Sequence, residues 1–287
     1  MNKTKISIIA ITLAALSMAS TLIVFNVPRP LLSGAKLVPE TKLDIAFYGD
    51  SRSDPKTHQQ IVSQIIKTKP DIVFHLGDFV DDSNSEAEWQ LVRSIVAPLQ
   101  EQSKFYSIPG NHELESEIYY RYFSKDAKAK WSSIDQGGAH IILLNSNLPL
   151  AKDSEQYRWL EEDLIATDDS RFKIVILHHA LLSVGSHAFD DLAFQSDLLE
   201  LFVRQRIDLV VSGHEHNYER FTYGNVIYIA TGGGGAPLHD QMTESPNLQK
   251  FAKEYNYCQL SFSGTKVWLT AYNEKEEVID RVDINNK

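Results

Sequence analysis

The sequence of 287 residues contains a single cysteine, Cys258. One cysteine cannot close an internal disulfide, and without a second one the chain has no CxxC pair that could hold a metal through thiolates. Any metal site must therefore use histidine, aspartate, asparagine or similar ligands. The sequence also lacks internal repeats and low-complexity tracts, which argues against a repeat array or a disordered chain.

Basic residues are scarce as well, with 28 Lys and Arg against 38 Asp and Glu, so the formal net charge is −10. A protein of this sign repels the phosphate backbone of nucleic acids, and no extended basic patch stands out, so we do not expect a nucleic-acid scaffold. Small phosphate substrates are not excluded, because bound metal ions can supply positive charge locally. The composition, with 43% hydrophobic and 23% charged residues, is that of a globular protein.

The N-terminus resembles a targeting segment. Lys3 and Lys5 precede a run from Ile6 to Val27 that contains no charged residue and is long enough as a helix to span a bilayer. One interpretation is an uncleaved signal anchor over residues 1–27, and the other is a signal peptide with a cleavage site near Ala19. A buried core helix is a third alternative. Both targeting interpretations place the rest of the chain outside the cytoplasm, as a membrane-anchored, secreted or periplasmic protein. Residues 28–41 then form a linker and residues 42–287 one catalytic domain.

From residue 42 onward, apolar strand-like runs alternate with amphipathic helical patterns. We expect strands at 43–49, 71–77, 104–110, 139–146, 172–178, 208–214, 225–230, 258–262, 267–272 and 278–284, and helices at 59–67, 88–99, 154–164 and 198–205. Few helices separate the last four strands, which favours antiparallel pairing among them. The pattern predicts a layered α/β fold with helices outside a two-sheet core.

Polar residues end five of the apolar runs or follow them directly: Asp50, Asp78, Asn111, His178 and His214. Sites in α/β folds assemble at the ends of strands, so these side chains are expected to converge. Two carboxylates, an amide and imidazoles around one point suit a borderline divalent metal. The local strings are GDSR (49–52), GDFVDD (77–82), GNHE (110–113), LHH (177–179) and GHEHNYER (213–220).

These strings, in this order, resemble the calcineurin-like metallophosphoesterases over roughly residues 43–235, and GHEHNYER looks most like their purple acid phosphatase branch. The resemblance implies a four-layer αββα sandwich with mixed sheets and two metal ions, which could be Fe, Mn or Zn. It implies that Asp78 bridges both metals, that Asp50 and His216 hold the first, and that Asn111, His178 and His214 hold the second. His112 would contact the substrate phosphate or the leaving group as the catalytic residue.

The chain departs from the family pattern beside the first metal position. Most members have a metal-binding histidine where this chain has Arg52, and the purple branch has a tyrosine where this chain has Asp81. The first metal therefore keeps three expected ligands, which Asp81 or water could complete. Arg52 either clamps the substrate phosphate or pairs with Asp54, Asp81 or Asp82.

The other histidines divide into one substrate-binding candidate and several structural ones. His187 lies nine residues after His178, a spacing similar to that of a substrate-contacting histidine in the purple branch; the alternative is an exposed loop residue. His58 and His239 are expected at the surface.

These patterns support three functional hypotheses. The first is an exported metal-dependent phosphoesterase that hydrolyses small phosphate esters by attack of a hydroxide on phosphorus, since two cations about 3.5–4 Å apart neutralise the ester and activate water. The second is a phosphodiesterase or nucleotide pyrophosphatase with the same dinuclear site. The third is a degenerate, non-catalytic envelope scaffold. The expected partners are a small phosphate ester and, if the N-terminal segment is retained, a membrane; the sequence indicates no protein partner.

Overall fold

The computed structural model describes residues 42–114, 116–123, 130–167, 171–190 and 192–284. The proposed targeting segment (1–27) and the proposed linker (28–41) lie outside these residues, so both stay predictions. None of the helices in the described ranges combines the length and the apolar character that crossing a membrane requires.

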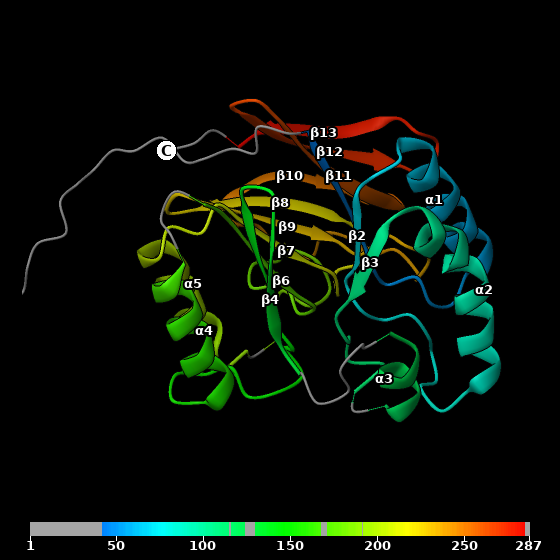
Figure 1. The fold of residues 1–287 in the computed structure, drawn as a ribbon, viewed down its shortest axis with the longest axis horizontal. Coiled ribbons are helices and arrows are strands. Elements are labelled where there is room, and N and C mark those ends of the chain that lie inside the picture. The colour runs from blue at the N-terminus through cyan, green and yellow to red at the C-terminus, as the bar shows by residue number, and fades with distance from the viewer. Residues whose placement is uncertain (1–41, 115, 124–129, 168–170, 191, 285–287) are drawn as a thin grey trace, which may run out of the picture. The chain divides into compact units, whose positions relative to one another are not determined.

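Two mixed β-sheets form the centre of the described domain (Figure 1). Within the described ranges, the first sheet has the strand order β13-β12-β11-β1-β2-β3. Strands β1, β2 and β3 run parallel to one another, whereas β11, β12 and β13 form an antiparallel meander joined to β1. The bounds of its strands are β1 Leu43–Tyr48, β2 Ile72–His75, β3 Lys104–Ser107, β11 Asn256–Ser263, β12 Lys266–Asn273 and β13 Val278–Asp283.

The second sheet, over the same described residues, has the order β10-β8-β9-β7-β6-β5-β4. Its central strands β5, β6, β7 and β9 are parallel, and antiparallel strands complete both of its edges. The bounds are β4 Ser132–Gln136, β5 Ala139–Leu143, β6 Phe172–Leu177, β7 Leu209–Ser212, β8 Tyr218–Tyr223, β9 Val226–Thr231 and β10 Leu248–Ala252.

Helices cover the outer faces of both sheets. Helices α1 (Pro55–Thr68) and α2 (Glu86–Gln102) lie on the first sheet, α4 (Glu155–Ala166) and α5 (Gln195–Arg204) lie on the second, and the short α3 (Glu117–Phe123) packs beside α2 (Figure 1). Along β1, Ile45 and Phe47 face the second sheet, whereas Ala46 and Tyr48 face the helices. The parallel strands β1, β2, β5, β6 and β7 are buried on both faces, unlike the edge strand β3, and they therefore read as continuous apolar runs.

The four-layer αββα sandwich implied by the resemblance is confirmed. Most predicted elements are found within a few residues of their expected bounds, but α3, β4, β8 and β10 were not predicted. The expected antiparallel pairing of the last four strands holds for β11, β12 and β13 and is wrong for β9, which runs parallel to β7 in the other sheet. A chain segment that changes sheets leaves no mark in its own hydrophobic pattern.

A buried histidine connects β4, β5 and α4. In β5, His140 Nδ1 lies 2.8 Å from Asp135 Oδ1, and its Nε2 lies 2.8 Å from Asp163 Oδ2. Both ring nitrogens can donate only when the imidazole is protonated. Burial lowers the pKa of His140, but the hydrogen bonds to the two carboxylates outweigh burial and hold the pKa above its ordinary value.

Replacing His140 with alanine is therefore expected to destabilise the protein more at about pH 6 than at about pH 9. The stabilising contribution is fully present below the unfolded-state pKa of about 6.5 and is lost as the pH rises through the raised native value. Urea denaturation at both pH values measures the difference. His58→Gln is a control whose effect on stability should change with pH in the opposite direction. Burial lowers the pKa of His58 to about 3 and keeps its native form neutral, so this substitution should destabilise the protein less at about pH 6 than at about pH 9. A His140→Ala effect that is equal at both pH values would contradict the charged pairing.

Candidate metal centre

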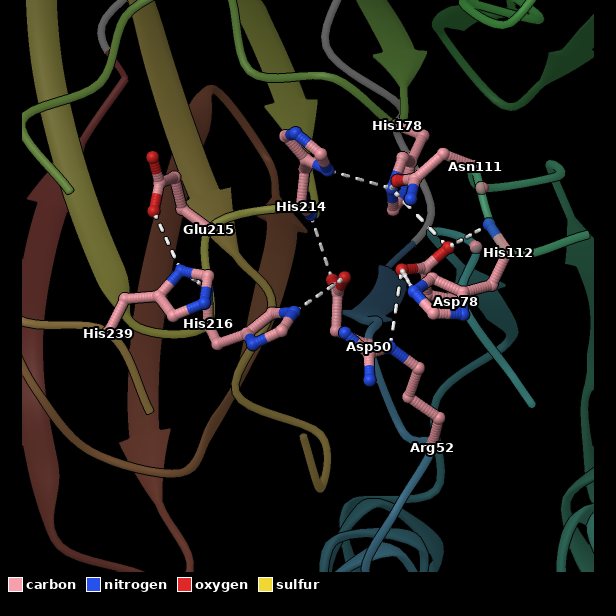
Figure 2. Close-up of polar contacts among 12 residues, drawn as sticks. Asp50, Arg52, Asp78, Asn111, His112, His178, His214, Glu215, His216 and His239 are labelled. Atoms are coloured by element: carbon pink, nitrogen blue, oxygen red, sulfur yellow. Dashed lines mark hydrogen bonds and ion pairs between the residues drawn. The ribbon is translucent and has the colours of Figure 1, made fainter. Parts of the chain in front are cut away.

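The predicted site residues all follow the carboxyl ends of parallel strands. Asp50 follows β1, Asp78 follows β2, and Asn111 with His112 follows β3. From the second sheet, His178 follows β6, and His214 with His216 follows β7. Because the carboxyl ends of parallel strands meet at one edge of a sheet, the fold brings these side chains together, and Figure 2 shows them around one point.

Asp50, Asp78 and His216 form the first group of candidate ligands, and one ligand atom from each lies within 4.8 Å of the others. All three side chains are buried. His216 directs Nδ1 to the carbonyl of Pro237 at 2.8 Å, which leaves Nε2 facing Asp50 Oδ1 at 3.6 Å. Asp50 Oδ1 is a buried oxygen with no hydrogen-bond partner, and a carboxylate oxygen left in that state is costly unless a cation neutralises it.

Asn111, His178 and His214 form the second group. His178 donates Nδ1–H to the carbonyl of Leu76 at 2.8 Å, so its Nε2 points at Asn111 Oδ1, 2.9 Å away, and lies 3.6 Å from Asp78 Oδ1. His214 places Nε2 at 3.2 Å from Asp190 Oδ2 and Nδ1 at 3.2 Å from His178 Nε2. Asp78 therefore touches both groups, as the bridging role requires.

The second group fits a metal ion because its facing atoms are all acceptors. When both rings are in the neutral form that ligates metals and their other nitrogens are engaged, the facing nitrogens of His178 and His214 carry lone pairs, and Asn111 adds a carbonyl oxygen. Lone pairs at these distances repel unless a cation lies among them, and imidazole nitrogen with carboxylate and amide oxygen is a donor set for Zn, Mn or Fe. The individual ligand assignments stay predictions.

The backbone is held in an unusual conformation at the ligands. Asp50, Asp78 and His214 have φ angles of 57°, 59° and 69°, in the left-handed region that non-glycine residues seldom adopt and that concentrates at functional sites. The preceding residue is glycine in each case. A Cβ atom on Gly213 would lie 2.5 Å from Asp50 Oδ2, so the close approach of this loop to the carboxylate requires glycine.

Charges in the site act on the carboxylates in opposite directions. Burial raises the pKa of Asp50 to about 8, although the charge of His178 opposes it. Burial also raises the pKa of Asp78, but His178, the His112 N–H and Arg52 together hold it below its ordinary value. The positive charge of Arg52 acts to lower the pKa of both carboxylates and of His216, so it reaches all three members of the first group.

His112 is oriented toward the Asp78 carboxylate. Its backbone N–H donates to Asp78 Oδ1 at 3.0 Å, and its ring Nδ1 lies 3.1 Å from the carbonyl of Asp81. Nε2 then faces Asp78 Oδ2 at 3.9 Å on a side chain that is 28% exposed. The imidazole can therefore meet a molecule that approaches from solvent.

Arg52 is paired with Asp81 rather than with Asp54 or Asp82. Its Nη1 lies 2.8 Å from Asp81 Oδ1, whereas Asp54 caps the N-terminus of α1. The Asp81 carboxylate is thus engaged by a guanidinium where it could have completed the first metal position. Substrate binding by Arg52 stays a prediction.

A loop at residues 183–187 carries His187 to the second group. The ring centroid of His187 lies 3.8 Å from that of His214, and His187 Nδ1 lies 3.1 Å from Asp190 Oδ2. Glu215 holds this loop, because its buried carboxylate accepts the N–H groups of Ser186 and His187 at 3.1 and 2.8 Å. His187 therefore lies beside the site, and its contact with substrate stays a prediction.

Sequence reasoning missed several of these supporting residues. His58 is buried, so the surface position expected for it is wrong. His239 is partly exposed, and it is also stacked on His216 with centroids 4.0 Å apart. Glu113 is buried and accepts the backbone N–H of Asp78, Phe79 and Gly110 at 2.7, 2.8 and 2.8 Å. Glu113 and Glu215 belong to the GNHE and GHEH strings, but a string does not show that a carboxylate is buried beneath the ligands. No sequence pattern marked Asp190 as a candidate site residue.

Comparison with known proteins gives one family model, that of the calcineurin-like phosphoesterases, which matches residues 43–218. A phosphoenolpyruvate phosphatase of Allium cepa is 28% identical over 229 residues, which cover 69% of this chain and 48% of the relative. A nucleotide pyrophosphatase/phosphodiesterase of Hordeum vulgare is 24% identical over 238 residues, which cover 67% of this chain and 65% of the relative. The chain thus spans about half to two thirds of the length of these relatives.

Among solved structures, a purple acid phosphatase from seeds of yellow lupin, Lupinus luteus, superposes with a TM-score of 0.75. The match covers 87% of this chain and 55% of the lupin chain at 20% sequence identity. At this identity the likeness shows the shared fold alone.

Proposed function

Because the chain belongs to the calcineurin-like phosphoesterase family, whose members use two metal ions, we propose that it is a phosphoesterase that hydrolyses phosphate esters at the centre described above. The observation that carries the proposal is the pair of ligand groups that Asp78 contacts: the first contains a buried, unpaired carboxylate oxygen, and the second directs histidine nitrogens and an amide oxygen toward one another. Two metal ions held there would neutralise the phosphate oxygens and lower the pKa of a bound water.

The side chains of the site have two tasks in this proposal: they hold the metal ions, and one of them supplies a proton. Asp78 and the two groups around it would hold the metal ions between loops of both sheets, and the ions would supply the positive charge that binds the phosphate. His112 Nε2 is the ring nitrogen left free by the contact of Nδ1 with the carbonyl of Asp81. In the protonated ring this nitrogen can give its proton to the departing alkoxide, which is general acid catalysis.

The substrate class is proposed to be small phosphomonoesters, with phosphodiesters or nucleotide pyrophosphates as the second candidate. The two relatives support both, because one is a phosphatase and the other a nucleotide pyrophosphatase/phosphodiesterase. The non-catalytic scaffold is less well supported, since both ligand groups are assembled in the described domain.

Removal of metal tests the proposal. We expect the full-length protein to contain two metals per chain by mass spectrometry, to lose turnover of a phosphomonoester after chelation, and to regain it with Mn²⁺, Fe²⁺ or Zn²⁺. A diester assayed on the same sample ranks the two substrate classes. No metal and no turnover after reconstitution would favour the scaffold.

We also propose that the domain acts outside the cytoplasm. The support is the charge-free run from Ile6 to Val27 preceded by Lys3 and Lys5. The mass of the chain isolated from membranes or from the medium distinguishes a retained anchor from a cleaved signal peptide.

A further inference from the structure

A guanidinium lies beside the first group of ligands. Arg52 Nε is 3.5 Å from Asp78 Oδ2, and its side chain is only 17% exposed. In Figure 2 the Arg52 head group points toward Asp78 and Asp50, and His216 lies on the opposite side of Asp50. A permanent positive charge therefore adjoins the carboxylates that would hold the first metal.

This guanidinium is held in place. Its Nη1 contacts Asp81 Oδ1 at 2.8 Å and Ser53 Oγ at 3.3 Å, and Ser53 in turn donates to Asp81 at 2.9 Å. Its Nε–H is buried and makes no hydrogen bond. The contacts with Asp81 and Ser53 orient the Arg52 side chain beside the first group of ligands.

The second group has the opposite electrostatic surroundings. Asp190 Oδ2 lies 3.2 Å from His214 Nε2, on the side of the ring away from the other ligands. A carboxylate behind a ligating imidazole raises the basicity of that imidazole and strengthens metal binding. One metal position thus has a cation next to it, and the other has an anion behind one of its ligands.

We infer that the two metal positions have unequal affinities, and that Arg52 weakens the first one, made by Asp50, Asp78 and His216. The inference rests on the proposed metal-dependent function. Arg52 gives the bridging carboxylate part of the positive charge that a metal would give, and it repels the ion that would replace it. At low free metal the protein holds one ion, and the dinuclear state forms only when the free metal concentration rises.

Equilibrium dialysis of the full-length protein against Mn²⁺, without substrate, tests this inference. In the wild type we expect one tightly bound ion and a second that binds at least about tenfold more weakly. In Arg52→Gln, which removes the charge at similar size, we expect the weaker dissociation constant to fall about tenfold and the tighter one to stay unchanged. The exchange-coupled Mn–Mn signal in electron paramagnetic resonance should then appear at lower Mn²⁺.

Two controls make the outcome specific. Arg204→Gln removes the same charge from α5, where Arg204 pairs with Glu161 on an exposed surface, and should change neither affinity. His216→Ala should abolish only the weaker site, and this assignment holds even if Arg52→Gln fails to fold. Equal affinities in the wild type, loss of the tight ion in His216→Ala, or an unchanged weak site in Arg52→Gln would overturn the inference. Absence of any bound metal would instead overturn the proposed function.

Discussion

Asp78→Ala is expected to lose both bound metals and to reduce phosphoester turnover by more than about a thousandfold, well beyond the roughly 10- to 100-fold cost of losing an outer partner of a metal ligand. The Asp78 carboxylate faces side-chain ligand atoms of both groups: Oδ1 lies 3.6 Å from His178 Nε2, and the side chain also belongs to the group with Asp50 and His216. Its loss leaves each position short of one negative ligand.

Metal content by mass spectrometry and turnover should therefore fall together in this variant. Asp78→Asn is a useful companion, because asparagine tolerates the positive φ of this position better than alanine does and removes the charge without deleting the side chain. Asp44→Asn is the matched control: Asp44 is also a buried carboxylate, at the start of β1, and it bonds Ser261 far from the site. An Asp78→Ala protein with two metals and normal turnover would refute the bridging role.

The sequence predicted the positions that define the site because each of them interrupts an apolar run. Asp50 and His214 come directly after glycine at the end of strands that are buried on both faces, and in such strands a charged residue stands out. The same reasoning located the layers, since continuous apolar runs separated by amphipathic helices are typical of parallel sheets covered by helices.

The missed strands have a different physical character. β4 and β10 are the edge strands of the second sheet and are short and partly exposed, so they show little of the apolar signal. In β8, Arg220 is a charged residue within the strand. It is paired with Asp280 of β13 at 2.6 Å, which joins the two sheets, and that partner is distant in the sequence.

The sequence motifs did not predict the contacts that Glu113 and Arg52 make. The GNHE string identified Asn111 and His112 but gave no reason to assign a task to Glu113, because its burial depends on loops from β2 and β3 meeting. Arg52 could be seen as an irregularity in the sequence, but its ion pair with Asp81 could be identified only from the structure, and substrate binding by Arg52 stays a prediction.

Glu113→Ala is expected to destabilise the protein by about 3–5 kcal/mol, because three buried N–H donors lose their acceptor. Glu113 Oε2 accepts from Asp78 and Gly110, and Oε1 accepts from Phe79. Burial, followed by the charge of Asp78, raises the pKa of Glu113 to about 8, while the three donors oppose the shift. A loss of this size is a large part of the roughly 5–15 kcal/mol that stabilises a typical domain.

The same substitution should also weaken metal binding, since Glu113 fixes the backbone that carries Asp78 in its left-handed conformation. Urea denaturation of the metal-free protein measures the stability, and metal dialysis measures the site. Glu88→Ala is the matched control, because Glu88 also accepts two backbone N–H groups, from Asp81 and Asp82, but in an exposed setting; its cost should stay below about 1 kcal/mol. If Glu113→Ala unfolds at the wild-type urea concentration and still binds two metals, the buried carboxylate does not support Asp78, which must then be held by its other contacts, with His112, Arg52 and His178.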